Sequence, residues 1–159
     1  TVLSGGLAYH RRVGQRMLDT LLVVRGERRR SFRLGIGAGL AHPAADALAL
    51  LDAPAVVPGV AAPRSAASGW LLHLDVKNVL ATHWETLFEN GRAVGFRVRL
   101  CETEGRAGRA HLRAFKRLAA ARQIDLQSQS LMELTIDEDR VAFDLSAYEW
   151  LAVEARFAS

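Results

Sequence analysis

The sequence predicts an all-β protein built around an immunoglobulin-like β-sandwich. Short apolar segments with alternating side chains recur at steady spacing through the second half of the chain, and turn residues separate them. Helical segments do not alternate with these strands, so a parallel βαβ architecture is excluded. The composition agrees, because 50% of the 159 residues are hydrophobic and 24% are charged, as in ordinary globular proteins.

The first part of the chain, residues 1–52, is predicted to form a strand hairpin followed by one helix. Residues 17–24 (MLDTLLVV) and 31–37 (SFRLGIG) are rich in β-forming side chains, and the polar sequence GERRR separates them. Residues 43–51 (PAADALALL) begin with a proline, which suits the first position of a helix, and continue with good helix formers.

The composition changes at residues 53–69 (APAVVPGVAAPRSAASG), which hold three of the four prolines. A run of this length without periodicity is rare inside a compact domain. We interpret it as a linker, or a long crossing, between two units.

The second part, residues 70–159, is predicted to be the sandwich domain. Its expected strands are residues 70–76, 78–88, 95–103, 110–117, 120–127, 131–136, 141–145 and 150–157. The sequence ENGR supplies an Asn-Gly turn, which is a strong signal for a hairpin. In the strand that follows, Phe96, Val98 and Leu100 share one face.

Charge, length and cysteine content restrict the function. The net charge of +4 comes mainly from scattered arginines, and no nucleic-acid recognition motif accompanies them, so a nucleic-acid partner is not expected. No apolar run approaches the roughly 20 residues that span a membrane. The single cysteine, Cys101, cannot form an internal disulfide, and we expect a cytoplasmic protein. Because the chain begins at Thr1, we interpret it as a piece of a longer protein.

Residues 95–115 (GFRVRLCETEGRAGRAHLRAF) contain the most suggestive carboxylates, Glu102 and Glu104. Two residues apart on a strand, they face the same side. Carboxylate pairs that cleave sugars flank the bond and usually come from different strands. We therefore expect a structural hairpin in which one of these carboxylates meets an arginine. The sequence GIGAG at 35–39 lacks the third glycine of a dinucleotide fingerprint, and a phosphate loop is not expected.

Other candidate site residues are few. His73 and Asp75 share a strand face, but no third metal ligand is evident, so a cross-strand hydrogen bond is the expected use. Trp84 and Trp150 lie inside strands and are expected in the core. The polar, loop-like cluster Tyr9, His10, Arg11 and Arg12 could reach a ligand, and these four residues are the predicted ligand-binding residues.

Three segments together resemble the C-terminal β region of bacterial α-mannosidase-like proteins of glycoside hydrolase family 38. The segments are GRAVGFRVRLCETEGRAGRAHLRAF, AAARQIDL and LMELTIDEDRVAFDLSAYEWLAVEARF, and the upstream GGLAYHRRVGQRMLDTLLVVRGE looks like the end of the preceding β-sandwich in such chains. These are β-strand patterns rather than catalytic signatures.

The resemblance implies a non-catalytic accessory domain. In that family the nucleophile, the acid/base residue and the zinc ligands lie in an N-terminal catalytic domain, and their motifs are absent here. No catalytic residue, metal ligand or cofactor is therefore assigned to this chain, which we expect to be inactive alone. The implied partner is the catalytic domain of the parent chain, and self-association of the fragment is a further expectation.

A second hypothesis remains open, namely an independent carbohydrate-binding β-sandwich module. Such a module should expose aromatic side chains on one face or in a groove. An accessory domain should instead bury its tryptophans and expose an apolar docking patch.

Overall fold

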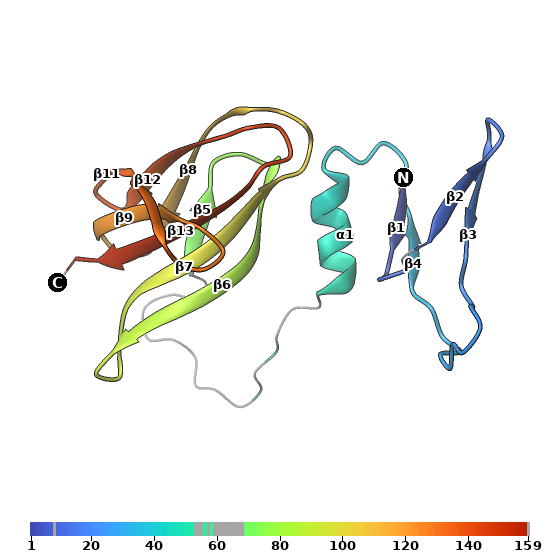
Figure 1. Ribbon diagram of the computed structural model, residues 1–159, viewed down its shortest axis with the longest axis horizontal. Helices are drawn as coiled ribbons and strands as arrows, with labels where there is room; N and C mark the ends of the chain where they lie inside the picture. The colour runs from blue at the N-terminus through green and yellow to red at the C-terminus, as the bar shows by residue number, and fades with distance from the viewer. Residues whose placement is uncertain (8, 53–55, 57, 59–68, 159) are drawn as a thin grey trace. The chain divides into compact units, whose positions relative to one another are not determined.

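The computed structural model describes residues 1–7, 9–52, 56, 58 and 69–158, and the chain divides into two compact units, Thr1–Val60 and Ala61–Ser159. The predicted linker at 53–69 lies almost wholly outside the described residues. The elements are β1 (Val2–Ser4), β2 (His10–Val13), β3 (Met17–Thr20), β4 (Leu34–Ile36), α1 (Pro43–Leu51), β5 (Leu72–Leu74), β6 (Val79–Glu89), β7 (Arg92–Glu102), β8 (Gly108–Ala114), β9 (Leu118–Ile124), β10 (Ser130–Glu133), β11 (Thr135–Asp137), β12 (Arg140–Leu145) and β13 (Trp150–Phe157) (Figure 1). The all-β class is confirmed.

The first unit contains two separate two-stranded sheets and α1. The predicted helix at 43–51 is confirmed with the same bounds. The predicted hairpin between residues 17–24 and 31–37 is wrong, because β3 pairs with β2 and β4 pairs with β1. The glycine-containing turn between β2 and β3 makes the local hairpin, whereas the second half of the predicted strand, residues 21–24, is in no strand.

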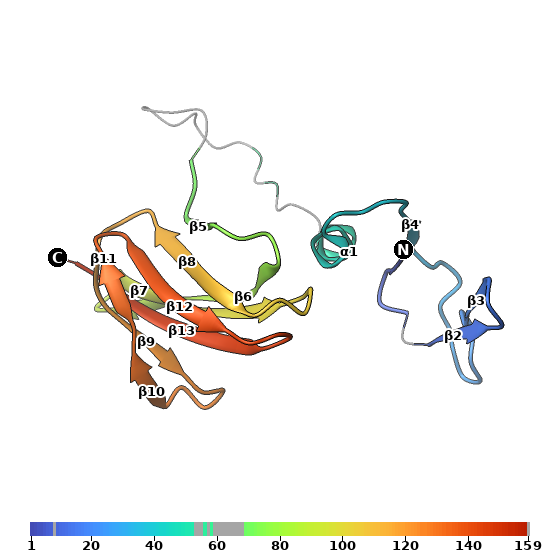
Figure 2. The same ribbon diagram turned by 90° about the horizontal axis from the view of Figure 1, so that it is seen from above.

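The second unit is a sandwich of two antiparallel sheets (Figure 2). One sheet has the order β11-β12-β8-β5, and the other has the order β10-β9-β13-β7-β6. An immunoglobulin sandwich places strands A-B-E-D in one sheet and C-F-G in the other. The four-stranded sheet matches A-B-E-D, and β9-β13 matches C-F. The place of strand G, beside β13, is taken by β7, which comes earlier in the chain as part of the β6–β7 hairpin.

Period-two alternation places the core between the sheets. Phe96, Val98 and Leu100 of β7 are fully buried, as their shared face predicted. The other buried apolar residues are Val79, Ala110, Leu112, Ala114, Leu118, Ala121, Ile124, Val141, Phe143, Leu145, Leu151, Ala152, Val153 and Ala155. The Asn-Gly turn is also confirmed, since Asn90 and Gly91 have φ of 50° and 75°.

The predicted hairpin at 95–115 is wrong. β7 pairs with β6 and β13, whereas β8 pairs with β5 and β12. The chain therefore crosses from one sheet to the other between Glu102 and Gly108. A glycine-rich connection is equally compatible with a hairpin and with such a crossing, so the local pattern could not distinguish them.

Gly95 on β7 should be intolerant of any side chain. A Cβ at this position would run into the backbone carbonyl oxygen of Ala155 on β13, which cannot move without breaking the sheet. We expect Gly95→Ala to lower the free energy of unfolding by about 1–3 kcal/mol, measured by urea denaturation.

Gly108→Ala is the matched control, because nothing lies within 4 Å of a Cβ built there. Equal stability of the two variants would contradict the close approach of β7 and β13.

Candidate functional site

Glu102 is the most unusual ionisable group of the second unit, because its side chain is buried and lacks an ion-pair partner among the described residues. It ends β7 on the inward side and is 1% exposed. Asn78 donates its side-chain N–H to Oε1 at 2.9 Å, and the Glu104 N–H donates to the same oxygen at 2.9 Å. The N–H groups of Gly105 and Tyr148 each donate to Oε2 at 2.8 Å.

These four donors determine the charge of Glu102. Burial by itself raises the pKa of this carboxyl, but the hydrogen bonds that it accepts, those from Tyr148, Asn78 and Glu104 among them, lower the pKa to about 2. The group is thus ionised at neutral pH, and the four donors occupy the lone-pair positions that a carboxylate offers. A carboxylate in this state has no proton to give and no free position to accept one, which supports a structural role.

Glu104 has a different environment from Glu102, although both were predicted to share a strand face. Its carboxylate lies 3.7 Å from Nε of Arg106, which fits the expectation that one of the two meets an arginine. Glu102 turns into the end of the sandwich, while Glu104 already belongs to the connection after β7. The two therefore do not form a catalytic pair.

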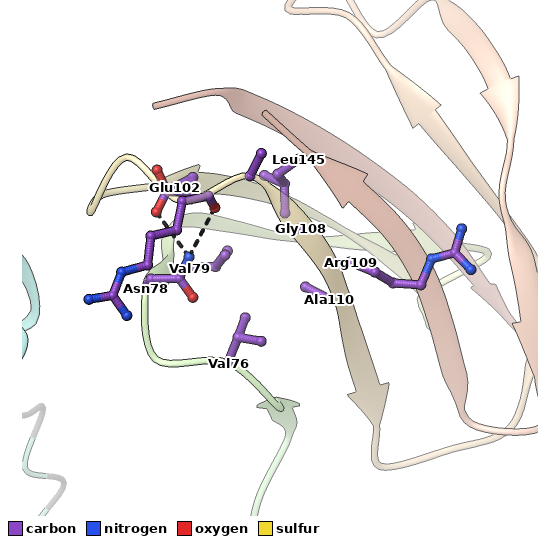
Figure 3. A pocket seen from close by; sticks show the side chains of 10 residues that line it. Val76, Asn78, Val79, Glu102, Gly108, Arg109, Ala110 and Leu145 are labelled. Carbon is purple, nitrogen blue, oxygen red and sulfur yellow. Dashed lines mark hydrogen bonds between the residues drawn. The ribbon is translucent and has the colours of Figure 1, made fainter. Parts of the chain in front are cut away.

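A small cavity of about 180 Å³ opens beside Glu102 at this end of the sandwich (Figure 3). Its walls include Val76, Asn78 and Leu145. Arg109 also lines it, but its side chain extends away from Glu102 and makes two hydrogen bonds to Asp144, at 3.0 and 2.9 Å. The cavity is smaller than the roughly 300 Å³ at which ordinary ligand pockets begin.

The four predicted ligand-binding residues lie on and next to β2 in the first unit. Tyr9, His10 and Arg11 line a hollow of about 580 Å³ together with Asp19, Thr20 and Leu21 of the paired segment. Arg12 is not part of this lining, and its guanidinium donates to the carbonyl oxygen of Gln15. The structure thus brings together three of the four residues.

The polar groups of this hollow already bond to one another. His10 contacts the Thr20 hydroxyl through Nδ1 at 3.0 Å and the Leu7 carbonyl through Nε2 at 3.1 Å. Arg11 forms an ion pair with Asp19 at 3.0 Å. Of the three predicted residues that line the hollow, Tyr9 offers an exposed ring to a ligand.

Asp75 bonds to His111 rather than to His73. It accepts the His111 N–H at 2.8 Å and contacts Nδ1 of the same residue at 2.7 Å. Although partial burial raises the pKa of Asp75, the hydrogen bonds and charge of His111 outweigh it and lower the pKa. This is the expected cross-strand hydrogen bond, but its partner is set by the pairing of β5 with β8, which the sequence alone did not reveal.

The tryptophans divide between core and surface. Trp84 is half-buried against the core and stacks on Phe96 with ring centroids 4.5 Å apart, as expected. The prediction that Trp150 lies in the core is wrong, because its side chain is 62% exposed. Trp150 has the same strand parity as Arg156, so it lies on the outer face of the five-stranded sheet. Trp70 is 49% exposed and lies against the guanidinium of Arg113.

Among the described residues, no group of three metal-ligating side chains comes together, and no helix is long and apolar enough to cross a membrane. A scan against protein-family models finds no matching family, and no curated protein matches the sequence. The resemblance to glycoside hydrolase family 38 therefore remains a prediction.

Glu102 should make the stability of the second unit sensitive to acid. Since its folded-state pKa of about 2 lies below the ordinary value of 4.5, its ionised form stabilises the fold above pH 4.5. That contribution is lost as the pH falls from about 4.5 towards 2. We expect Glu102→Gln to lower the melting temperature at pH 7 and to flatten the melting-temperature profile between pH 5 and pH 2.

Glu133→Gln is the control, because this exposed carboxylate makes no ion pair or hydrogen bond among the described residues. If Glu102→Gln and Glu133→Gln gave the same pH profile, the structural role of Glu102 would be refuted.

Proposed function

We propose that this chain is a non-catalytic accessory β-domain of an α-mannosidase-like glycoside hydrolase, and that it supports a catalytic domain by packing against it. The sequence resemblance supplies the family in this proposal. The single cysteine makes the cytoplasm the proposed location, and the resemblance implies that the zinc of the parent enzyme belongs to its catalytic domain. The chain itself is proposed to bind through its surface rather than to catalyse a reaction.

The observation that carries the proposal is the absence of buried side chains among the described residues of the first unit. None of the described residues from Thr1 to Asp52 is buried. In the second unit, by contrast, all but two of the buried apolar residues form one continuous cluster. A unit with many apolar side chains and no interior of its own gains stability by placing them against another protein surface.

Residues 21–24 (LLVV) illustrate this most clearly. Their exposed fractions lie between 43% and 55%. They continue directly from β3, but the partner strand β2 begins at His10. Among the described residues, only Leu21 bonds to the segment before β2, through the Tyr9 carbonyl. A run that is apolar on both faces is typical of a strand buried on both sides. This supports burial of the segment against the catalytic domain.

The alternative, a carbohydrate-binding module, is favoured by two exposed tryptophans, Trp70 and Trp150. Sugar-binding surfaces use exposed aromatic rings, whereas an accessory domain has no need of them. The two functions are compatible, because they involve different units of the chain.

The proposed packing predicts that Leu22→Asp affects the melting temperature of the full-length parent protein but not that of the chain alone. In the chain alone, where Leu22 is exposed, the melting temperature should change little. In the full-length parent protein, the same change should lower the melting temperature by several degrees, because a buried leucine contributes about 1.5–3 kcal/mol. Hydrolysis of an aryl α-mannoside should be detected only with the parent.

Leu131→Asp in β10 of the second unit is the matched control, since Leu131 is also exposed. An equal effect of Leu22→Asp in the chain and in the parent would exclude the packing role. Lack of α-mannoside hydrolysis by the parent would remove the family assignment and leave the packing result intact.

A further inference from the structure

The outer face of the five-stranded sheet carries a row of alternating charges. Glu85, Arg97, Glu154, Arg122 and Glu133 lie directly opposite one another on β6, β7, β13, β9 and β10. Glu154 is buried at the centre, 2.6 Å from Nε of Arg97 and 2.6 Å from Nη2 of Arg122. The central carboxylate of this row is therefore neutralised by the two arginines on the adjacent strands.

Arg99 is the exception among the arginines of this face. Arg97 and Arg122 bond to Glu154, and Arg156 bonds to Glu89. Arg99 is exposed and has no carboxylate within ion-pair distance among the described residues. Its opposite neighbours are His83 on β6 and Ala152 on β13, neither of which supplies a negative charge. Its guanidinium is consequently available to an external anion.

An exposed tryptophan lies beside Arg99. Trp150 precedes Ala152 by two residues on β13, so it shares the outer face and is the diagonal neighbour of Arg99. Diagonal neighbours on a sheet are roughly 7–8 Å apart, within reach of long and aromatic side chains. β7 and β13 are adjacent strands of this sheet (Figure 1). The face thus offers a flat ring and an unpaired planar cation side by side.

The chemistry of these two groups indicates the class of ligand that would fit them. A tryptophan ring presents an apolar face on which the C–H face of a pyranose can stack, while its edge stays in water. A guanidinium binds a carboxylate through two parallel hydrogen bonds. The nearby carboxylate of Glu154 does not oppose an anion here, because it is already neutralised by Arg97 and Arg122.

We propose that the outer face of the five-stranded sheet, around Trp150 and Arg99, binds an acidic saccharide, with a pyranose ring on Trp150 and its carboxylate on Arg99. The site lies wholly within the second unit. It is independent of the packing proposed for the first unit, and it gives the carbohydrate-binding alternative a particular ligand class. Failure of one proposal leaves the other untouched, since each has its own assay.

The test is isothermal titration calorimetry of the chain with a galacturonic acid trisaccharide. The corresponding galactose trisaccharide is the neutral comparison, and sulfate tests for an anion site without sugar recognition. We expect the acidic trisaccharide to bind at micromolar to millimolar strength and with salt dependence. Trp150→Ala and Arg99→Gln should each weaken binding about fivefold or more, the effect typical of aromatic and arginine residues central to an interface.

Two variants provide matched controls. Trp70→Ala removes an exposed tryptophan elsewhere, and Arg156→Gln removes an arginine of the same face that is already paired with Glu89. Both should keep the affinity of the unchanged chain. Because Trp150 and Arg99 are exposed, their variants should also retain the original melting temperature.

The proposal would be overturned by no binding of the acidic trisaccharide, by equal binding of the neutral one, or by equal losses in the control variants. Equal affinity for sulfate and for the acidic trisaccharide would show that the site binds anions without recognising a sugar, and would also refute the proposal.

Discussion

The hydrogen bonds to the Glu102 carboxylate hold together one end of the sandwich. Asn78 precedes β6, Glu104 and Gly105 follow β7, and Tyr148 precedes β13, so one side chain joins three connections that are distant in sequence. A buried charge without these donors would be costly, which means that the connections must adopt their observed geometry together. Tyr148 even takes a left-handed backbone conformation, with φ of 60°, while it donates to Glu102.

We propose recognition on an outer face of the sandwich, because the inner faces already supply its stability. On the five-stranded sheet, cross-strand pairs satisfy most charges, and the unpaired Arg99 beside Trp150 stands out against that background. The first unit has the opposite character, since apolar residues are plentiful and none of the described ones is buried. The proposed division of roles follows from this contrast: the first unit packs against a partner and the second provides a polar surface.

Much of the sandwich could be predicted from sequence because its signals are local. Alternation located the strands of the second unit and the inward face of β7, and the Asn-Gly turn identified the β6–β7 hairpin. Pro43 and the residues after it specified α1. The failures concern pairing. The 17–24 strand was assigned to the wrong partner, and the 95–115 segment crosses between sheets. The predicted 131–136 strand is divided between β10 and β11, which belong to different sheets.

The sequence by itself determined the all-β class, the single helix and most strand positions, since side-chain periodicity and turn chemistry act over a few residues. Only the tertiary structure decided which strands are neighbours, because pairing depends on contacts between segments far apart in the chain. That arrangement gave Asp75 the partner His111 and placed Trp150 on the surface. The same arrangement placed β7, which comes earlier in the chain, beside β13, where an immunoglobulin sandwich has strand G. It also made Glu102 a structural carboxylate, because its donors come from three separate loops.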